Sequence, residues 1–119
     1  MSQNSTDCLF CKIASGDIPG DIVFEDDTLI AFNDIHPQAP VHILIVPKQH
    51  VSTLNELNDP NRDISVISDL TNRAIILAKE SGIDDSGFRI LMNCNREGGQ
   101  TVYHLHMHLL GGRQLGALC

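Results

Sequence analysis

The chain has 119 residues, with 15 acidic against 8 basic side chains and a formal net charge of −7. This length predicts one domain spanning residues 1–119, with residues 1–7 expected to be flexible. The negative charge and the absence of a Lys/Arg cluster disfavour a nucleic-acid polymer as partner. The sequence contains no signal-peptide pattern and no apolar run near the roughly 20 residues of a membrane span, so we expect a cytoplasmic protein without membrane association.

Turn residues and apolar periodicity predict an α+β fold with a mostly antiparallel sheet that carries a helix. The expected elements, in chain order, are a short helix at 8–15, a hairpin of strands at 22–25 and 29–33, a loop at 34–40, a strand at 42–46, a long helix, and strands at 88–92 and 104–110. The long helix has apolar residues at helical spacing from Ile64 to Ala78. Asp59 and Pro60 are its expected start, and Gly82 is its expected cap.

Three alternate histidines occupy the last predicted strand. His104, His106 and His108 share one face there, and the apolar residues between them share the other face, which is expected to join the core. Neighbouring histidines of this set lie roughly 6.7 Å apart and the outer two roughly 13 Å. One phosphate or metal ion can therefore contact two of them but rarely all three, and one outer histidine is expected to have a separate role. A neutral imidazole suits a nucleophile, a general acid or a metal ligand.

The loop before this strand, NREGGQT at 95–101, contains two consecutive glycines. Gly98 and Gly99 allow a backbone to approach a ligand closely, as phosphate-binding loops require. Gln100 and Thr101 add neutral hydrogen-bond donors. A glycine pair is also typical of an ordinary turn, so its position next to the histidines is what favours a phosphate site.

Cys8 and Cys11 have the CxxC spacing of a metal or redox site. The predicted order of elements lacks the βαβ pattern of thioredoxin-like redox proteins, and thiols in the cytoplasm are usually reduced. A tetrahedral zinc ion needs two further ligands, for which His50 and the outer histidine His104 are the candidates. A site with four protein ligands is structural and activates no water. The alternative is a pair of reduced cysteines in an amphipathic N-terminal turn.

Three segments, at 10–19, 24–50 and 95–113, resemble the histidine triad (HIT) superfamily, and in particular its Hint branch. They read FCKIASGDIP, FEDDTLIAFNDIHPQAPVHILIVPKQH and NREGGQTVYHLHMHLLGGR. The resemblance implies a single HIT domain with a five-stranded antiparallel sheet, one long and one short helix per subunit, and a homodimer. It also implies binding of purine nucleoside monophosphates and hydrolysis of their phosphoramidates, without an organic cofactor.

The resemblance further assigns roles to individual residues. His106 corresponds to the nucleophile that attacks the α-phosphorus and forms a nucleotidyl-imidazole intermediate, which water then cleaves. His108 corresponds to the histidine that contacts the phosphate and the leaving group, and His42 completes the proton-handling set. The nucleotide-binding positions are Asp34 for the ribose hydroxyls, Asn93 and Thr101 for the phosphate, and Phe10, Ile13, Phe32, Ile35 and Leu44 for the base. Gly99, Gln100 and Val102 are further expected nucleotide-binding residues of the loop. Bacterial-type members carry a Cys/Cys/His/His zinc site, which matches Cys8, Cys11, His50 and His104.

Other functions remain open. The chain could be a nucleotide-binding regulatory dimer with little catalysis, or a dinucleoside polyphosphate hydrolase. The nucleotidyl-transferase branch typically has glutamine in place of the last histidine, so His108 disfavours it. The histidine spacing disfavours a catalytic metal held by all three rings. The chain has no tryptophan, whereas some animal members end in a tryptophan-containing tail, so the preferred leaving group is left open.

Overall fold

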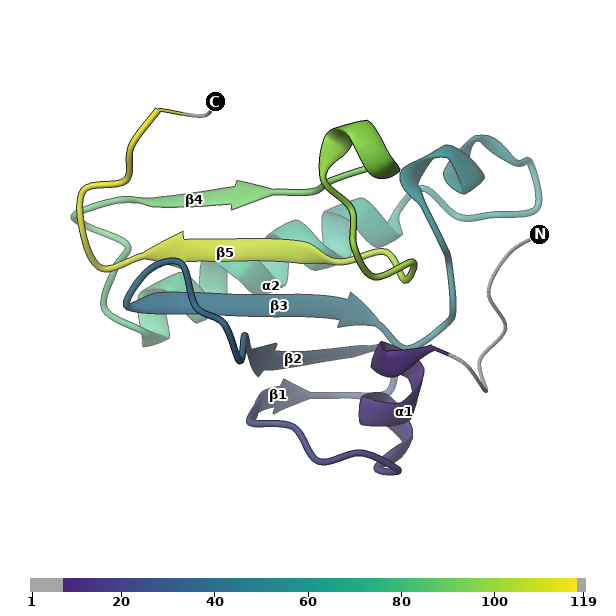
Figure 1. The fold of residues 1–119 in the computed structure, drawn as a ribbon, viewed down its shortest axis with the longest axis horizontal. Coiled ribbons are helices and arrows are strands. Elements are labelled where there is room, and N and C mark those ends of the chain that lie inside the picture. The colour runs from purple at the N-terminus through teal and green to yellow at the C-terminus, as the bar shows by residue number, and fades with distance from the viewer. Residues whose placement is uncertain (1–7, 118–119) are drawn as a thin grey trace.

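A computed structural model describes residues 8–117 of the chain, so the expectation of flexibility for residues 1–7 lies outside the described residues. Five antiparallel strands form one sheet in the order β1-β2-β3-β5-β4 (Figure 1). The strands are β1 (Ile22–Glu25), β2 (Leu29–Asn33), β3 (Val41–Pro47), β4 (Phe88–Leu91) and β5 (Met107–Gly111). The helices are α1 (Leu9–Ser15) and α2 (Val66–Glu80), with short 3₁₀ turns η1 (Leu54–Asn58) and η2 (Arg96–Gly98). The predicted α+β class is confirmed.

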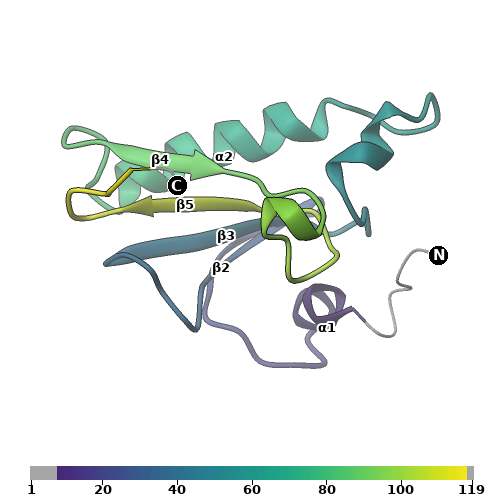
Figure 2. The same cartoon turned by 45° about the horizontal axis from the view of Figure 1, so that its top comes forward.

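The two helices lie on opposite faces of the sheet, as Figure 2 shows. α2 buries Leu70, Ala74, Leu77 and Ala78 against one face. α1 buries Phe10 and Ile13 against the other face, where they join a second cluster with Cys8, Ile30, Phe32, Leu44 and Val46. β2 and β3 are thus covered on both sides, and this explains why both read as nearly continuous apolar runs rather than as alternating patterns. Among the described residues, no helix is long and apolar enough to cross a membrane.

The predicted start of the long helix is wrong. α2 begins at Val66, and the backbone N–H of Asp59 instead closes η1 by donating to the carbonyl of Glu56. Two aspartates then hold successive turns, because Asp59 accepts from the N–H of Asn61 and Asp63 accepts from the N–H of Ser65. Such side-chain bonds compete with helical hydrogen bonding and delay the helix.

The end of the long helix agrees with the prediction. The backbone N–H of Ser81 donates to the carbonyl of Leu77, and Gly82 follows in the left-handed conformation with φ of 74°. This conformation costs glycine least, which is why glycine is common at the position just beyond a helix. The chain can then turn back toward the sheet and enter β4.

The last strand is shorter than predicted, because it begins at Met107 rather than at His104. Ile45 of β3 pairs with Met107, so continued pairing would place Pro47 opposite Leu105. Proline has no N–H to donate, and the N–H of Leu105 bonds instead to the carbonyl of Val51 at 2.6 Å. The predicted alternation nevertheless continues beyond the strand: Leu105 packs in the core beneath α2, whereas His104 and His106 face α1.

Candidate metal centre and active site

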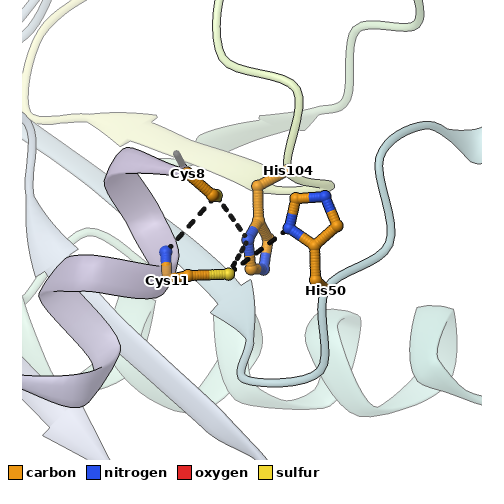
Figure 3. A group of neighbouring side chains, drawn as sticks. All are labelled: Cys8, Cys11, His50 and His104. Carbon is orange, nitrogen blue, oxygen red and sulfur yellow. Dashed lines mark hydrogen bonds between the residues drawn. The ribbon is translucent and has the colours of Figure 1, made fainter. Parts of the chain in front are cut away.

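Four side chains from three separate parts of the chain meet at the N-terminal end of α1 (Figure 3). Cys8 is the N-cap of α1, and Cys11 lies in its first turn with its N–H directed at the Cys8 sulfur at 3.4 Å. His50 follows β3 and His104 precedes β5. One potential ligand atom from each residue lies within 4.8 Å of all the others.

The spacing of these atoms suits a tetrahedral zinc ion. His104 Nδ1 lies 3.1 Å from Cys8 Sγ and 3.4 Å from Cys11 Sγ, and His50 Nδ1 lies 3.3 Å from Cys11 Sγ. Ideal Zn–S and Zn–N bonds at tetrahedral angles would separate sulfur and nitrogen by about 3.6 Å. Only a small expansion of the cluster would therefore accommodate the ion. The donor set, two thiols and two imidazoles, is one that zinc uses in structural sites.

The outer contacts of the two histidines also fit metal ligation. His104 Nε2 donates to the carbonyl of Pro47 at 2.7 Å, which leaves Nδ1 as the unprotonated nitrogen facing the thiols. His50 Nε2 lies 3.2 Å from the hydroxyl of Ser52. Metal-binding histidines usually engage their second nitrogen in this way. Burial lowers the pKa of His104 to about 4 and raises that of the Cys11 thiol to about 12, so a metal ion would displace thiol protons on binding.

His106 lies next to this cluster but belongs to a different environment. Its Nδ1 donates to the carbonyl of His104 at 2.7 Å, so Nε2 carries the free lone pair. The edge-to-face contact with Phe10, at 5.0 Å between ring centroids, restrains the ring from the side of α1. Burial lowers the pKa of His106 below its ordinary 6.5 and keeps the ring neutral at pH 7. A neutral, oriented imidazole with one free nitrogen can act as a nucleophile.

His42 and His108 form a hydrogen-bonded pair beside His106. His42 Nε2 lies 2.9 Å from His108 Nδ1 and 3.4 Å from Asp34 Oδ2, and the rings of His106 and His108 are 5.0 Å apart. Burial, followed by the proximity of His106 and His42, lowers the pKa of His108 to about 4 although Asp34 opposes the shift. Burial also lowers the pKa of His42. Both rings are neutral at pH 7 in the protein without ligand.

Asp34, His42 and His108 could in principle hold a second metal ion, because their ligand atoms lie within 4.8 Å of one another. The surroundings of His42 argue against it. The backbone N–H of Gln38 points at His42 Nδ1 at 3.0 Å. An amide N–H only donates, so the hydrogen of neutral His42 resides on Nε2, the nitrogen that a metal ion would need. In His104, by contrast, the hydrogen is on Nε2 and the unprotonated Nδ1 faces the thiols.

The loop between β4 and β5 is held by Gln100, whose side chain is buried. Its Nε2 donates to the carbonyls of Ser52 at 2.8 Å and Val102 at 3.1 Å, and its Oε1 accepts the N–H of Asn95 at 2.8 Å. Asn95 has φ of 63°, an uncommon value for a residue other than glycine. The side chain of Gln100 therefore braces a strained turn and has no donor left for a ligand.

Hydrogen bonds within this loop reduce the number of N–H groups that are available to a ligand. The N–H groups of Gly99 and Gln100 bond to the carbonyls of Arg96 and Asn95. Those of Thr101 and Val102 donate to no other residue within 8–117, and the same holds for the side-chain amide of Asn93. Asn93 Nδ2 lies 3.8 Å from the Cβ position of Gly99, so the amide faces this loop. These groups are the ones that could bind an anion.

The predicted base-binding residues separate into two groups. The structure joins Phe10, Ile13, Phe32 and Leu44 in the buried cluster beneath α1, adjacent to His106. Ile35 is 83% exposed, in the loop that carries Asp34. Asp34 itself uses Oδ1 to accept the N–H of His36 at 2.8 Å, while Oδ2 faces His42. A ligand next to His106 would have a buried apolar floor.

The sequence did not predict the roles of three residues that support the site. Ser52 links the metal cluster to the loop, because its hydroxyl contacts His50 and its carbonyl accepts from Gln100. Gln38 contacts His42 through its main chain, and Arg113 contacts the carbonyl of Gln38 at 2.6 Å. Ser52 and Arg113 each make a contact with a segment far away in the chain, and Gln38 acts through a main-chain N–H, so residue type and spacing give no signal for these roles.

Comparison with known proteins agrees with this geometry. The family model described as the HIT domain matches residues 15–115 of the chain. The chain belongs to the HIT family. The resemblance of the three segments around the alternate histidines is thereby confirmed.

Relatives of this HIT protein are similar over nearly their full length. It is 46% identical to the purine nucleoside phosphoramidase of Escherichia coli strain K12, over 92% of this chain and 91% of the relative. It is 45% identical to a 14 kDa zinc-binding protein of Brassica juncea, over 92% of this chain and 96% of the relative. The crystal structure of a HIT family hydrolase from Legionella pneumophila Philadelphia 1 is 51% identical and superposes with a TM-score of 0.88, covering 92% of this chain and 96% of that one.

Proposed function

We propose that the protein hydrolyses purine nucleoside phosphoramidates to a nucleoside monophosphate and an amine, through a covalent nucleotidyl intermediate on His106. The observation that carries this proposal is the hydrogen bond from His106 Nδ1 to the carbonyl of His104, which leaves Nε2 unprotonated in a ring that stays neutral at pH 7. The similarity to the E. coli purine nucleoside phosphoramidase supports the substrate class.

The substrate is held by groups on three sides of His106. We assign the ribose hydroxyls to Asp34, whose Oδ2 has no amide partner within 8–117. We assign the phosphate oxygens to the main-chain N–H groups of Thr101 and Val102 and to the amide of Asn93. The free N–H groups would stabilise charge on the non-bridging oxygens as the phosphorus is attacked. Gln100 contributes by bracing this loop, and Gly99 by its left-handed turn at φ of 88°.

In the first step, His106 Nε2 attacks the phosphorus, and the bond between phosphorus and the amine nitrogen breaks. The departing nitrogen must receive a proton to leave as a neutral amine. His108 is neutral in the free protein because its pKa is about 4. The negative charge of the bound phosphoramidate favours the protonated ring and raises this pKa, so His108 can take up a proton on binding and deliver it.

In the second step, water attacks the phosphorus and the bond between phosphorus and His106 Nε2 breaks. Imidazole is an effective leaving group for the same reason that it is an effective nucleophile, so division into two displacements lowers the barrier. The proton lost by the attacking water passes to the His42–His108 pair, which releases it to solvent when the product leaves. Both protein groups then return to their starting states, and the nucleoside monophosphate is released.

We propose a structural role for zinc at Cys8, Cys11, His50 and His104. Four protein ligands fill a tetrahedral shell, so the ion would supply no activated water. Its function would be to tie α1 to the segment that carries His106. The similarity to the zinc-binding protein of Brassica juncea supports the choice of metal.

We further propose that the protein acts as a homodimer in the cytoplasm. β4 is an edge strand of the sheet, and it leaves Phe88 and Ile90 each 36% exposed on one face. Apolar side chains along an unpaired edge are a liability that proteins usually cover. A second copy of the chain would cover them.

The decisive experiment measures hydrolysis of adenosine 5′-phosphoramidate by the wild type, by His106→Ala and by His36→Ala. We expect His106→Ala to lose activity by at least about a thousandfold, as expected for loss of a nucleophile, and an acid-labile adenylyl group to be detected on wild-type His106 by mass spectrometry. His36 is an exposed loop histidine and serves as the matched control. Equal rates for wild type and His106→Ala would contradict the proposal.

The same assay separates the alternative functions. Tight binding of adenosine monophosphate without turnover of any phosphoramidate would indicate a binding protein rather than an enzyme. Faster turnover of a dinucleoside polyphosphate than of the phosphoramidate would assign the chain to that hydrolase class. Either result would contradict the substrate class that we propose.

A further inference from the structure

A chain of hydrogen bonds outside the reacting groups sets the proton positions of the His42–His108 pair. The backbone N–H of Gln38 lies 3.0 Å from His42 Nδ1. Because the amide can only donate, Nδ1 accepts, and the single hydrogen of neutral His42 must reside on Nε2. That hydrogen faces His108 Nδ1 at 2.9 Å and Asp34 Oδ2 at 3.4 Å.

The same reasoning extends to His108. Its Nδ1 accepts from His42, so the hydrogen of neutral His108 resides on Nε2, across the ring from the nitrogen that His42 contacts. His108 can then donate only from Nε2. In the ligand-free protein, where both rings are neutral, the direction of every hydrogen bond in the pair is thus determined by one backbone amide of the loop between β2 and β3.

The position of that amide depends on the segment that follows β5. Arg113 Nη2 donates to the carbonyl of Gln38 at 2.6 Å, and its Nη1 donates to the carbonyl of Gln114 at 2.9 Å. Gly112 approaches the same loop so closely that a Cβ there would lie 2.9 Å from Pro40 Cβ. Gln38 itself is exposed to solvent. Arg113 and the turn before it therefore fasten the loop at Gln38 and Pro40.

We infer that Gln38, through its main-chain N–H, and Arg113, through the Gln38 carbonyl, are positioning residues that select the Nε2–H form of His42 and thereby of His108. The catalytic consequence rests on the proposed function, because it assumes that His108 donates to the leaving amine. The assignment of hydrogens does not depend on catalysis and can be tested separately.

The test uses zinc-loaded full-length protein labelled with ¹⁵N, in which two-bond ¹H–¹⁵N correlations identify the protonated nitrogen of each histidine. Five proteins are compared: wild type, Gln38→Ala, Gln38→Pro, Arg113→Lys and Arg113→Ala. Gln38→Ala and Gln38→Pro both remove the side chain, but only proline removes the N–H. We expect hydrogen on His42 Nε2 alone in the wild type and in Gln38→Ala, and a mixture of both forms in Gln38→Pro.

Steady-state kinetics with the phosphoramidate provide the second readout. Loss of one hydrogen bond corresponds to roughly a three- to tenfold effect. We expect kcat of Gln38→Pro to fall by that factor relative to Gln38→Ala, with KM changed by less than about threefold. Arg113→Ala should give the same pattern in kcat and in the His42 spectrum, and Arg113→Lys should restore part of it.

The outcomes are distinct. Hydrogen on His42 Nδ1 in the wild type would overturn the inference, as would identical His42 spectra for Gln38→Pro and Gln38→Ala in folded proteins. If Gln38→Pro fails to fold, a wild-type His42 spectrum in Arg113→Ala would overturn the role of Arg113. If the wild type does not hydrolyse phosphoramidates, the proposed function fails, whereas the spectra still decide where the hydrogens lie.

Discussion

His106 Nδ1 donates to the carbonyl oxygen of His104 across 2.7 Å, so the candidate nucleophile is oriented by the main chain of a candidate metal ligand. The ring of His104 lies among Cys8, Cys11 and His50, while its carbonyl accepts from His106. A metal ion that immobilises His104 would therefore also immobilise the acceptor that orients His106. The candidate metal centre and the candidate active site are therefore adjacent, and His104 takes part in both, through its ring and through its carbonyl.

Loss of the metal centre is expected to loosen α1 and the floor of the site. We expect Cys11→Ala to lose stoichiometric zinc and to lower Tm by roughly 10 °C. We also expect weaker binding of adenosine monophosphate, because Phe10 lies between Cys8 and Cys11 in the chain and its ring contacts His106. Metal analysis, thermal melting and calorimetric titration would measure these effects. Cys94→Ala is the matched control, since Cys94 is a free cysteine outside the cluster. Retention of one zinc ion per chain in Cys11→Ala would refute the four-ligand site.

Gln100 is expected to be essential for the loop rather than for direct contact with the nucleotide. In Gln100→Glu the carboxylate cannot donate to the carbonyls of Ser52 and Val102, so two buried acceptors face a negative charge. We expect destabilisation of about 2–3 kcal/mol and a raised KM. Gln49→Glu makes the same chemical change at an exposed position and should alter neither quantity. Chemical denaturation and steady-state assays test this, and a stable Gln100→Glu with normal KM would contradict the bracing role.

A side chain at Gly111 is expected to destabilise the fold. A Cβ at this position would lie 2.7 Å from Ile83 Cδ1, 3.3 Å from Ile83 Cβ and 3.4 Å from the carbonyl oxygen of Gly87. We expect Gly111→Ala to reduce the free energy of unfolding by about 1–3 kcal/mol through overpacking. Gly116→Ala, where a Cβ meets nothing within 4 Å, is the control and should change little. Urea unfolding of the two variants measures the difference, and equal values would show that the β5 end can expand.

Acid is expected to destabilise the protein through its buried histidines. Burial holds the pKa of His108 at about 4, below the 6.5 of an exposed histidine, so the unfolded chain binds the proton more readily than the folded one. The stability that depends on this group is complete above pH 6.5 and is lost as the pH falls from 6.5 toward 4. Tm of zinc-loaded protein should therefore fall across this window, and less steeply in His108→Asn. Comparison of wild type and His108→Asn at the same pH separates the effect of His108 from loss of the metal. If Tm falls equally with pH in both proteins, the pKa of His108 is not lowered by folding.

The edge strand β4 is expected to form the dimer contact. A charge at Phe88 would be buried without a partner in such an interface, so Phe88→Glu should dissociate the dimer at micromolar concentration. Ile64→Glu makes the same kind of change at a residue that is 62% exposed, before the start of α2, and should leave the mass unchanged. Light scattering coupled to size-exclusion chromatography would measure both. A monomeric wild type would remove the basis of the prediction.

Local chemistry made several parts of the fold predictable. Asp26 accepts the N–H groups of Thr28 and Leu29, and the resulting turn forms the predicted hairpin. Gly82 follows the long helix where it was expected. The prediction failed where a partner distant in the chain decides the outcome: Pro47 ends pairing with the residues before Met107, and this cannot be read from the alternation of histidines alone.

The sequence by itself determined which residue types are available for chemistry and that alternate histidines face one side, because a strand's side chains alternate. It also indicated that one of the two outer histidines acts apart from the other two, because an extended backbone separates His104 from His108. The tertiary structure alone decided which nitrogen of each ring is free, since this depends on acceptors and donors supplied by Pro47, Gln38 and the His104 carbonyl. The bond from His104 to Pro47 joins segments 57 residues apart, whereas Gln38 and His42, and likewise His104 and His106, are neighbours in the chain that only the folded backbone brings into hydrogen-bonding geometry. Residue spacing does not encode that geometry, yet it decides whether an imidazole can bind a metal, attack phosphorus or donate a proton.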